Sequence, residues 1–147
     1  MTTIPGDIGP RGDCFTAAGQ RILEMRGQSR PLTQLKQVHI PQTLQDQLFE
    51  PPPSWSLVHG VVTGSPDTPV SGLRFVHAWL ECVDRLGSTW VLDCANDREL
   101  FVPADLYYRF GTIRDDECIR YPQDDAVYLL QKTGYFGPWV SFLYVDA

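Results

Sequence analysis

Apolar side chains near the N-terminus recur at steps of three and four residues, which is the spacing of one face of a helix. The apolar positions of this stripe are Phe15, Ala18, Ile22 and Met25. Asp13 comes just before it, and its carboxylate is well placed to accept the free backbone N–H groups of a first helical turn. The pattern predicts a helix over residues 14–26, with Cys14 at its first position.

Later in the chain, short runs rich in β-branched and aromatic residues alternate with loops, as is typical of strands. Strands are predicted over residues 55–63, 74–82, 88–94, 99–102 and 139–145. Short helices are predicted over residues 43–49, 104–110 and 122–133. We therefore expect an α+β fold with an antiparallel β-sheet packed against an N-terminal Cys-bearing helix, as a single domain over residues 1–147.

The hairpin between the second and third predicted strands brings two polar residues together. If Cys82 pairs with Ser88, then His77 lies directly opposite Asp93 on the same face, with Cβ atoms about 4.5–5.5 Å apart. A register shift of two residues would leave them diagonal on one face, whereas an odd shift would separate them. The same register pairs Leu80 with Trp90 and Ala78 with Leu92, which look like the buried face, whereas the His77 face is more mixed.

Composition and charge narrow the class of protein. The chain has 147 residues, of which 43% are hydrophobic and 20% charged, which is typical of a globular domain. A net charge of -6 gives no support to nucleic-acid binding. No apolar run approaches the ~18 residues of a membrane span, and the first residues lack a secretion signal pattern. We expect a cytoplasmic protein without membrane contact, or one delivered into a target cell by a non-classical route.

The chemistry expected of Cys14 sets it apart from the other cysteines. The four cysteines are Cys14, Cys82, Cys94 and Cys118, and they form no CxxC pair, so they are interpreted as free thiols. The positive end of a helix dipole and a nearby imidazole would both favour a thiolate at Cys14. We predict Cys14 as nucleophile, His77 as base and Asp93 as orienter, with the Cys14 backbone N–H as an oxyanion donor.

Two segments also resemble a known family. HAWLE (residues 77–81) and GSTWVLDCAN (residues 87–96) resemble the core motif of the transglutaminase-like group within the papain-like cysteine hydrolases. In that group a His-Ala-Trp strand is followed by a hairpin and a Trp-Val-x-Asp strand, and the cysteine opens an earlier helix. The resemblance implies a papain-like core and chemistry on amides: proteolysis, glutamine deamidation or acyl transfer to an amine. It is nearest to small bacterial or phage hydrolases and deamidases, some of which act as effectors.

Four further residues are candidates for substrate binding: His59, Trp79, Asn96 and Tyr108. His59 could line the cleft, or it could be a strand-edge histidine near a bulge. Asn96 is the second choice, after Asp93, for orienting His77. Trp79 is expected in the core or a cleft wall, and Tyr108 could donate to a substrate carbonyl.

Two other kinds of protein were weighed against this reading. A zinc site is the weaker account because no two candidate ligands have a tight spacing, so no metal or cofactor is predicted. A non-catalytic protein-binding or inhibitor module on the same fold is the alternative function, since an acidic chain with 12% aromatic residues suits a protein-binding surface. The expected partner is a protein or peptide substrate, and the sequence leaves the oligomeric state open.

Overall fold

A computed structural model describes residues 13–25, 41–66, 68–95 and 99–140 of the chain. Its elements follow in the order α1 (Asp13–Met25), α2 (Gln42–Phe49), β1 (Trp55–Thr63), β2 (Arg74–Val83), β3 (Thr89–Asp93), β4 (Leu100–Pro103), α3 (Ala104–Phe110), a 3-10 helix η3 (Asp115–Glu117), β5 (Cys118–Pro122) and α4 (Gln123–Thr133). Among these residues no helix is long and apolar enough to cross a membrane.

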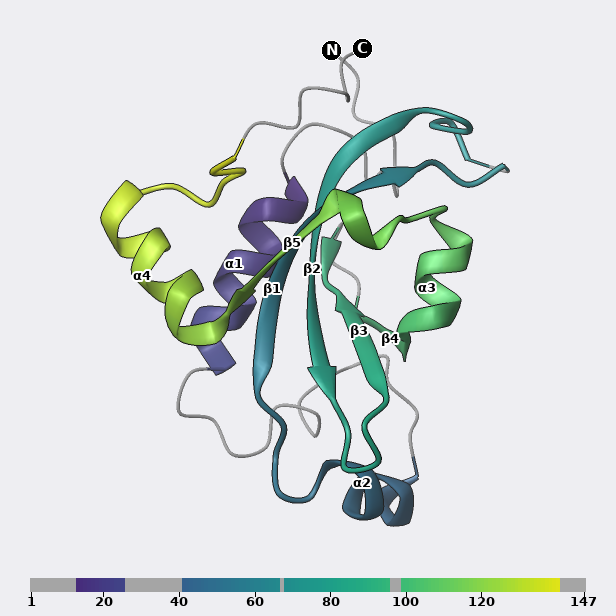
Figure 1. Ribbon diagram of the computed structural model, residues 1–147, viewed down its shortest axis with the longest axis vertical. Coiled ribbons are helices and arrows are strands. Elements are labelled where there is room, and N and C mark those ends of the chain that lie inside the picture. Colours follow the sequence, from purple (N-terminus) through teal and green to yellow (C-terminus); the bar gives the residue numbers. More distant parts are fainter. Residues whose placement is uncertain (1–12, 26–40, 67, 96–98, 141–147) are drawn as a thin grey trace.

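The five strands form one antiparallel sheet in the order β4-β3-β2-β1-β5. Helices α1 and α4 lie against one face of the sheet, and α3 lies on the other side, beside β3 and β4 (Figure 1). The prediction of an α+β fold with an antiparallel sheet is confirmed.

Each face of the sheet has its own apolar cluster. The cluster under α1 and α4 includes Ile22, Leu80 and Leu92, and the cluster under α3 includes Trp79 and Val91. We expected only the Leu80 face to be well buried, but α3 covers the opposite face as well. Most residues of β1 and β2 are buried, because helices cover both faces of the sheet at these strands.

The predicted register of the β2–β3 hairpin is wrong by two residues. Leu80 pairs with Leu92 instead of Trp90, and the last pair before the turn is Val83 with Thr89. The Asp84 side chain explains the difference: its carboxylate accepts the backbone N–H groups of Leu86 (2.8 Å) and Ser88 (3.0 Å) and the indole N–H of Trp90 (2.9 Å). These hydrogen bonds stabilise a turn that begins after Val83, so the last pair of the hairpin is Val83 with Thr89 and not the predicted Cys82 with Ser88.

Most element boundaries lie close to the predicted ones, and β1 and α3 match them. Helix α1 begins one residue earlier than predicted, which makes Cys14 its second residue. Strand β5 was not predicted as a separate strand; in the described part of the chain it is a short edge strand that pairs with β1.

The predicted strand over residues 139–145 is absent at residues 139 and 140, and residues 141–145 lie outside the described residues. There the Trp139 indole instead donates to Thr133 Oγ1 and to the Tyr135 carbonyl, at 3.1 Å each, which folds the segment back on α4.

The packing of α1 gives a stability prediction. Ile22 is fully buried between α1 and the sheet, so Ile22→Ala should lower the free energy of unfolding by about 2–5 kcal/mol. The matched control is Leu106→Ala on α3, where the side chain is 53% exposed and the change should stay within about 0.5 kcal/mol. Urea unfolding followed by circular dichroism measures both, and equal effects would contradict the packing described here.

Candidate active site

The centre of the site is a buried pair formed by His77 of β2 and Asp93 at the end of β3. Nε2 of His77 lies 3.0 Å from Oδ2 of Asp93. The last ladder pair between the two strands is Leu80 with Leu92, so His77 and Asp93 are diagonal neighbours on one face instead of directly opposite. The predicted proximity is therefore confirmed, although the predicted register is not.

Asp93 accepts hydrogen bonds at both carboxylate oxygens. Its Oδ2 also accepts the Tyr107 hydroxyl from α3 at 2.6 Å, and its Oδ1 accepts the Ala95 backbone N–H at 2.9 Å. Burial by itself would raise the pKa of Asp93, but the charge of His77 and the bonds from His77, Tyr107 and Ala95 lower it to about 2. Asp93 is therefore a carboxylate at neutral pH.

Asp93 and Cys14 both influence the pKa of His77. Burial alone would lower the pKa of His77, but the charges of Asp93 and Cys14 and the hydrogen bond to Asp93 raise it to about 10. Nδ1 of His77 has no aligned hydrogen-bond partner in the described part of the chain, while Nε2 is engaged with Asp93. Nδ1 is therefore the ring nitrogen that the contact with Asp93 leaves unengaged.

All three side chains are enclosed by protein. The exposed fractions are 1% for Cys14, 0% for His77 and 1% for Asp93, and Cys14 belongs to the apolar cluster under α1. The mixed composition of the His77 face had led us to expect a less deeply buried site. In this conformation a substrate carbonyl would reach the Cys14 sulfur only after the protein opens.

His59 is buried among aromatic rings. Its ring packs against the rings of Phe15, Tyr121 and Trp139, with centroids 4.8, 5.2 and 5.1 Å away, and it is fully buried. Neither ring nitrogen has a hydrogen-bond partner within the described ranges, and burial lowers the pKa of His59 to about 3. His59 is thus a neutral core histidine, which fits neither of the two predicted readings.

The other predicted binding residues lie in different places. Trp79 is buried with its ring centroid 6.0 Å from that of His77, so it forms a wall of the pair as expected. Tyr108 faces a separate pocket instead of the pair. Asn96 lies outside the described residues.

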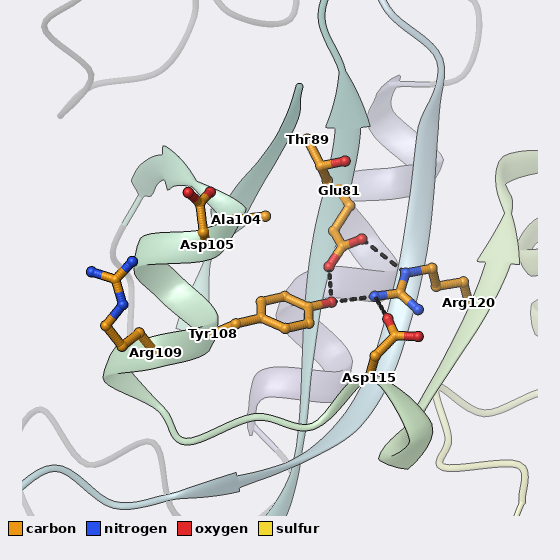
Figure 2. Close-up of a pocket in the computed structure, with 8 residues that line it drawn as sticks. All are labelled: Glu81, Thr89, Ala104, Asp105, Tyr108, Arg109, Asp115 and Arg120. Atoms are coloured by element: carbon orange, nitrogen blue, oxygen red, sulfur yellow. Dashed lines mark hydrogen bonds and ion pairs between the residues drawn. The ribbon is translucent and has the colours of Figure 1, made fainter. Parts of the chain in front are cut away.

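The pocket that contains Tyr108 is an open hollow of about 600 Å³ beside α3 (Figure 2). Its lining residues are Glu81, Thr89, Ala104, Asp105, Tyr108, Arg109, Asp115 and Arg120. Glu81 accepts the Trp79 indole N–H at 2.9 Å, the Tyr108 hydroxyl and the Arg120 Nε–H at 3.0 Å. Cys14, His77 and Asp93 do not line it.

Sequence reasoning missed the contribution of Tyr107 and of the Ala95 backbone N–H. No sequence pattern distinguishes Tyr107 from Tyr108 in this respect, because nothing in the sequence says which strand α3 packs against. Only the fold shows that one of these adjacent tyrosines bonds Asp93 and the other bonds Glu81.

Neither a metal cluster nor a known relative defines this site. Among the described residues no group of three or more His, Cys, Asp or Glu side chains could hold a metal ion. No protein-family model, curated protein or solved structure matches the chain. The interpretation of the site therefore depends on its geometry and on the residues that compose it.

The raised pKa of His77 makes a prediction about stability. A group whose pKa is higher in the folded state contributes its full stabilisation at pH values below its unfolded-state pKa. That contribution is lost as the pH rises through its folded-state pKa. The test needs a background without the thiol, because a proton shared with Cys14 would leave the folded and unfolded wild type with equal numbers of bound protons. Between pH 6.5 and 9, the free energy of unfolding should fall in Cys14→Ser, whose hydroxyl does not titrate. The fall should be much smaller in the double variant Cys14→Ser/His77→Gln, which has no titrating ring at this position. Urea unfolding at several pH values measures both slopes, and parallel slopes would contradict the His77–Asp93 interaction.

Proposed function

We propose that this protein is a cysteine-dependent hydrolase or acyltransferase that acts on amide bonds, on a papain-like or transglutaminase-like core. The observation that carries the proposal is the buried His77–Asp93 pair with its 3.0 Å contact, in a chain with Cys14 near the start of α1. A nucleophile, a base and a carboxylate that orients the base are the parts needed for acyl transfer. The resemblance of residues 77–81 and 87–96 to the transglutaminase-like group supports the same chemistry.

The first step would form a thioester. One proton is shared between the Cys14 thiol and Nδ1 of His77, so that the resting pair is thiolate and imidazolium. The thiolate attacks the amide carbon, and the carbonyl π electrons move onto oxygen. The Cys14 backbone N–H is an oxyanion donor, because the first N–H groups of a helix have no intrahelical acceptor. The intermediate collapses as the C–N bond breaks, and His77 gives its proton to the departing nitrogen.

The second step would resolve the thioester. His77, now neutral at Nδ1, takes a proton from water or from an amine as that nucleophile attacks the carbonyl carbon. The C–S bond breaks and the thiolate is regenerated beside the imidazolium. Water gives hydrolysis or deamidation, and an amine gives transamidation. Asp93 holds Nε2 throughout, which leaves Nδ1 facing the reaction.

The burial of Cys14 favours a second candidate, a non-catalytic protein-binding module on the same fold. A thiol that is 1% exposed inside an apolar cluster can be a structural residue. The two candidates differ in what Cys14 does when the protein opens, and the alkylation experiment below separates them.

Alkylation of Cys14 tests whether the thiol is activated. Burial raises the pKa of Cys82 strongly, that of Cys94 to about 12 and that of Cys118 to about 11, so these thiols should react slowly at pH 6. Iodoacetamide at about pH 6 should therefore modify Cys14 first, as read by peptide mass spectrometry. In His77→Gln the rate at Cys14 should fall at least about tenfold, because the imidazolium no longer stabilises the thiolate.

The comparison of these two rates separates activation from access. The ratio of the rates reports the influence of His77 on the thiol when alkylation is slower than opening, so the rates are compared at iodoacetamide concentrations where they rise in proportion to the reagent. Cys118→Ser is the matched control, because it removes the half-exposed cysteine without touching the pair. Equal rates at Cys14 in the wild type and in His77→Gln would end the enzyme proposal and leave the binding module.

Substitution of the nucleophile tests catalysis itself. Incubation with a library of glutamine- and asparagine-containing peptides and methylamine should produce cleaved, deamidated or amine-modified peptides, which mass spectrometry distinguishes. Cys14→Ser should lower the rate at least about 1,000-fold while the urea midpoint stays near that of the wild type. A folded Cys14→Ser protein with unchanged turnover would show that any activity arises elsewhere.

A further inference from the structure

We propose that Tyr107 is a positioning residue for the triad, which acts on His77 through Asp93; this inference rests on the proposed function. The Tyr107 hydroxyl donates to Asp93 Oδ2 at 2.6 Å. The same oxygen accepts Nε2 of His77 at 3.0 Å. One carboxylate oxygen therefore receives two donors, one from α3 and one from β2.

The surrounding contacts hold Tyr107 in this place. Its side chain is buried in the cluster under α3, and its ring centroid lies 5.4 Å from that of Trp79. Trp79 in turn lies beside the His77 ring, at 6.0 Å between centroids. With Oδ1 of Asp93 fixed by the Ala95 backbone N–H, neither carboxylate oxygen is free to turn away from the imidazole.

The hydrogen bond from Tyr107 should set the proton affinity of the pair. A hydroxyl that donates to a carboxylate stabilises its negative charge and draws part of that charge away from its other partner. Without the hydroxyl, Oδ2 would carry more charge toward His77, and the imidazolium would hold its proton more tightly. The pKa values of Asp93 and His77 should therefore both rise, and proton return to the leaving nitrogen should slow.

The neighbouring tyrosine provides a matched control. Tyr108 follows Tyr107 on α3, but its hydroxyl donates to Glu81 in the pocket of Figure 2. Tyr108→Phe removes the same atom from the same helix without removing a donor from Asp93. A general effect of weakening α3 would appear in both variants, whereas an effect through Asp93 would appear only in Tyr107→Phe.

The experiment is a nuclear magnetic resonance titration of the full chain with labelled histidine. The ring signals are assigned by comparison with His77→Gln and followed from about pH 6 to 11. In Tyr107→Phe the apparent pKa of His77 should rise by about half a unit or more, while Tyr108→Phe should match the wild type. A His77 curve that is the same in all three proteins would overturn the role of Tyr107, as would an equal shift in both variants.

A second substitution keeps the proposal falsifiable if Tyr107→Phe does not fold. Site-specific 3-fluorotyrosine at position 107 preserves the ring and makes the hydroxyl a stronger donor, so the apparent pKa of His77 should move down instead of up. A shift upward, or none, would contradict the proposal.

The titration and the turnover assay test different claims: the titration tests the role of Tyr107, and the turnover assay tests the proposed function. The titration needs no substrate, so an unchanged His77 curve rejects Tyr107 whether or not the protein has amidase activity. Absence of activity in the wild type rejects the proposed function even where the His77 curve shifts. With activity present, Tyr107→Phe should lower kcat about tenfold with little change in KM, because Tyr107 touches Asp93 and not the substrate.

Discussion

The buried contact between His77 and Asp93 is the interaction on which this site depends. Both charges of an ion pair in the protein interior lose their hydration. Their mutual attraction offsets this loss only when the remaining polar atoms of the pair also have hydrogen-bond partners. Asp93 meets that condition, since its oxygens accept from His77, Tyr107 and Ala95. A buried, well-satisfied pair of this kind contributes little net stability, and strongly shifted pKa values of this kind cluster at functional sites.

The fold brings these groups together from opposite sides of the sheet. Helix α1 supplies Cys14 from one side, β2 and β3 supply the pair, and α3 supplies the Tyr107 hydroxyl from the other (Figure 1). Burial on both faces keeps water from competing with the hydrogen bonds to Asp93. The same burial closes the site to substrate, so activity would require an opening motion that the chemistry itself does not supply.

The proximity of His77 and Asp93 was predicted correctly although the predicted register of the hairpin was wrong by two residues. Side chains alternate between faces along a strand, so a register error of two residues leaves His77 and Asp93 on one face, and only the type of neighbour changes from opposite to diagonal. The true register depends on Asp84, whose turn hydrogen bonds no periodicity reveals. The position of Tyr107 depends on how α3 packs against β3, and the burial of Cys14 depends on how α1 packs against the sheet. Local sequence patterns do not predict such contacts between residues far apart in the chain.

The proposed chemistry depends on one proton being shared between Cys14 and His77. Thiolate absorbs more strongly than thiol at about 240 nm, so the difference spectrum between the wild type and Cys14→Ser isolates the ionisation of this one cysteine across pH. If the proton is shared, the thiolate signal is already present in mildly acidic solution, and replacing His77 with Gln moves its appearance to alkaline pH. A signal that appears only at alkaline pH in both backgrounds would contradict the shared proton.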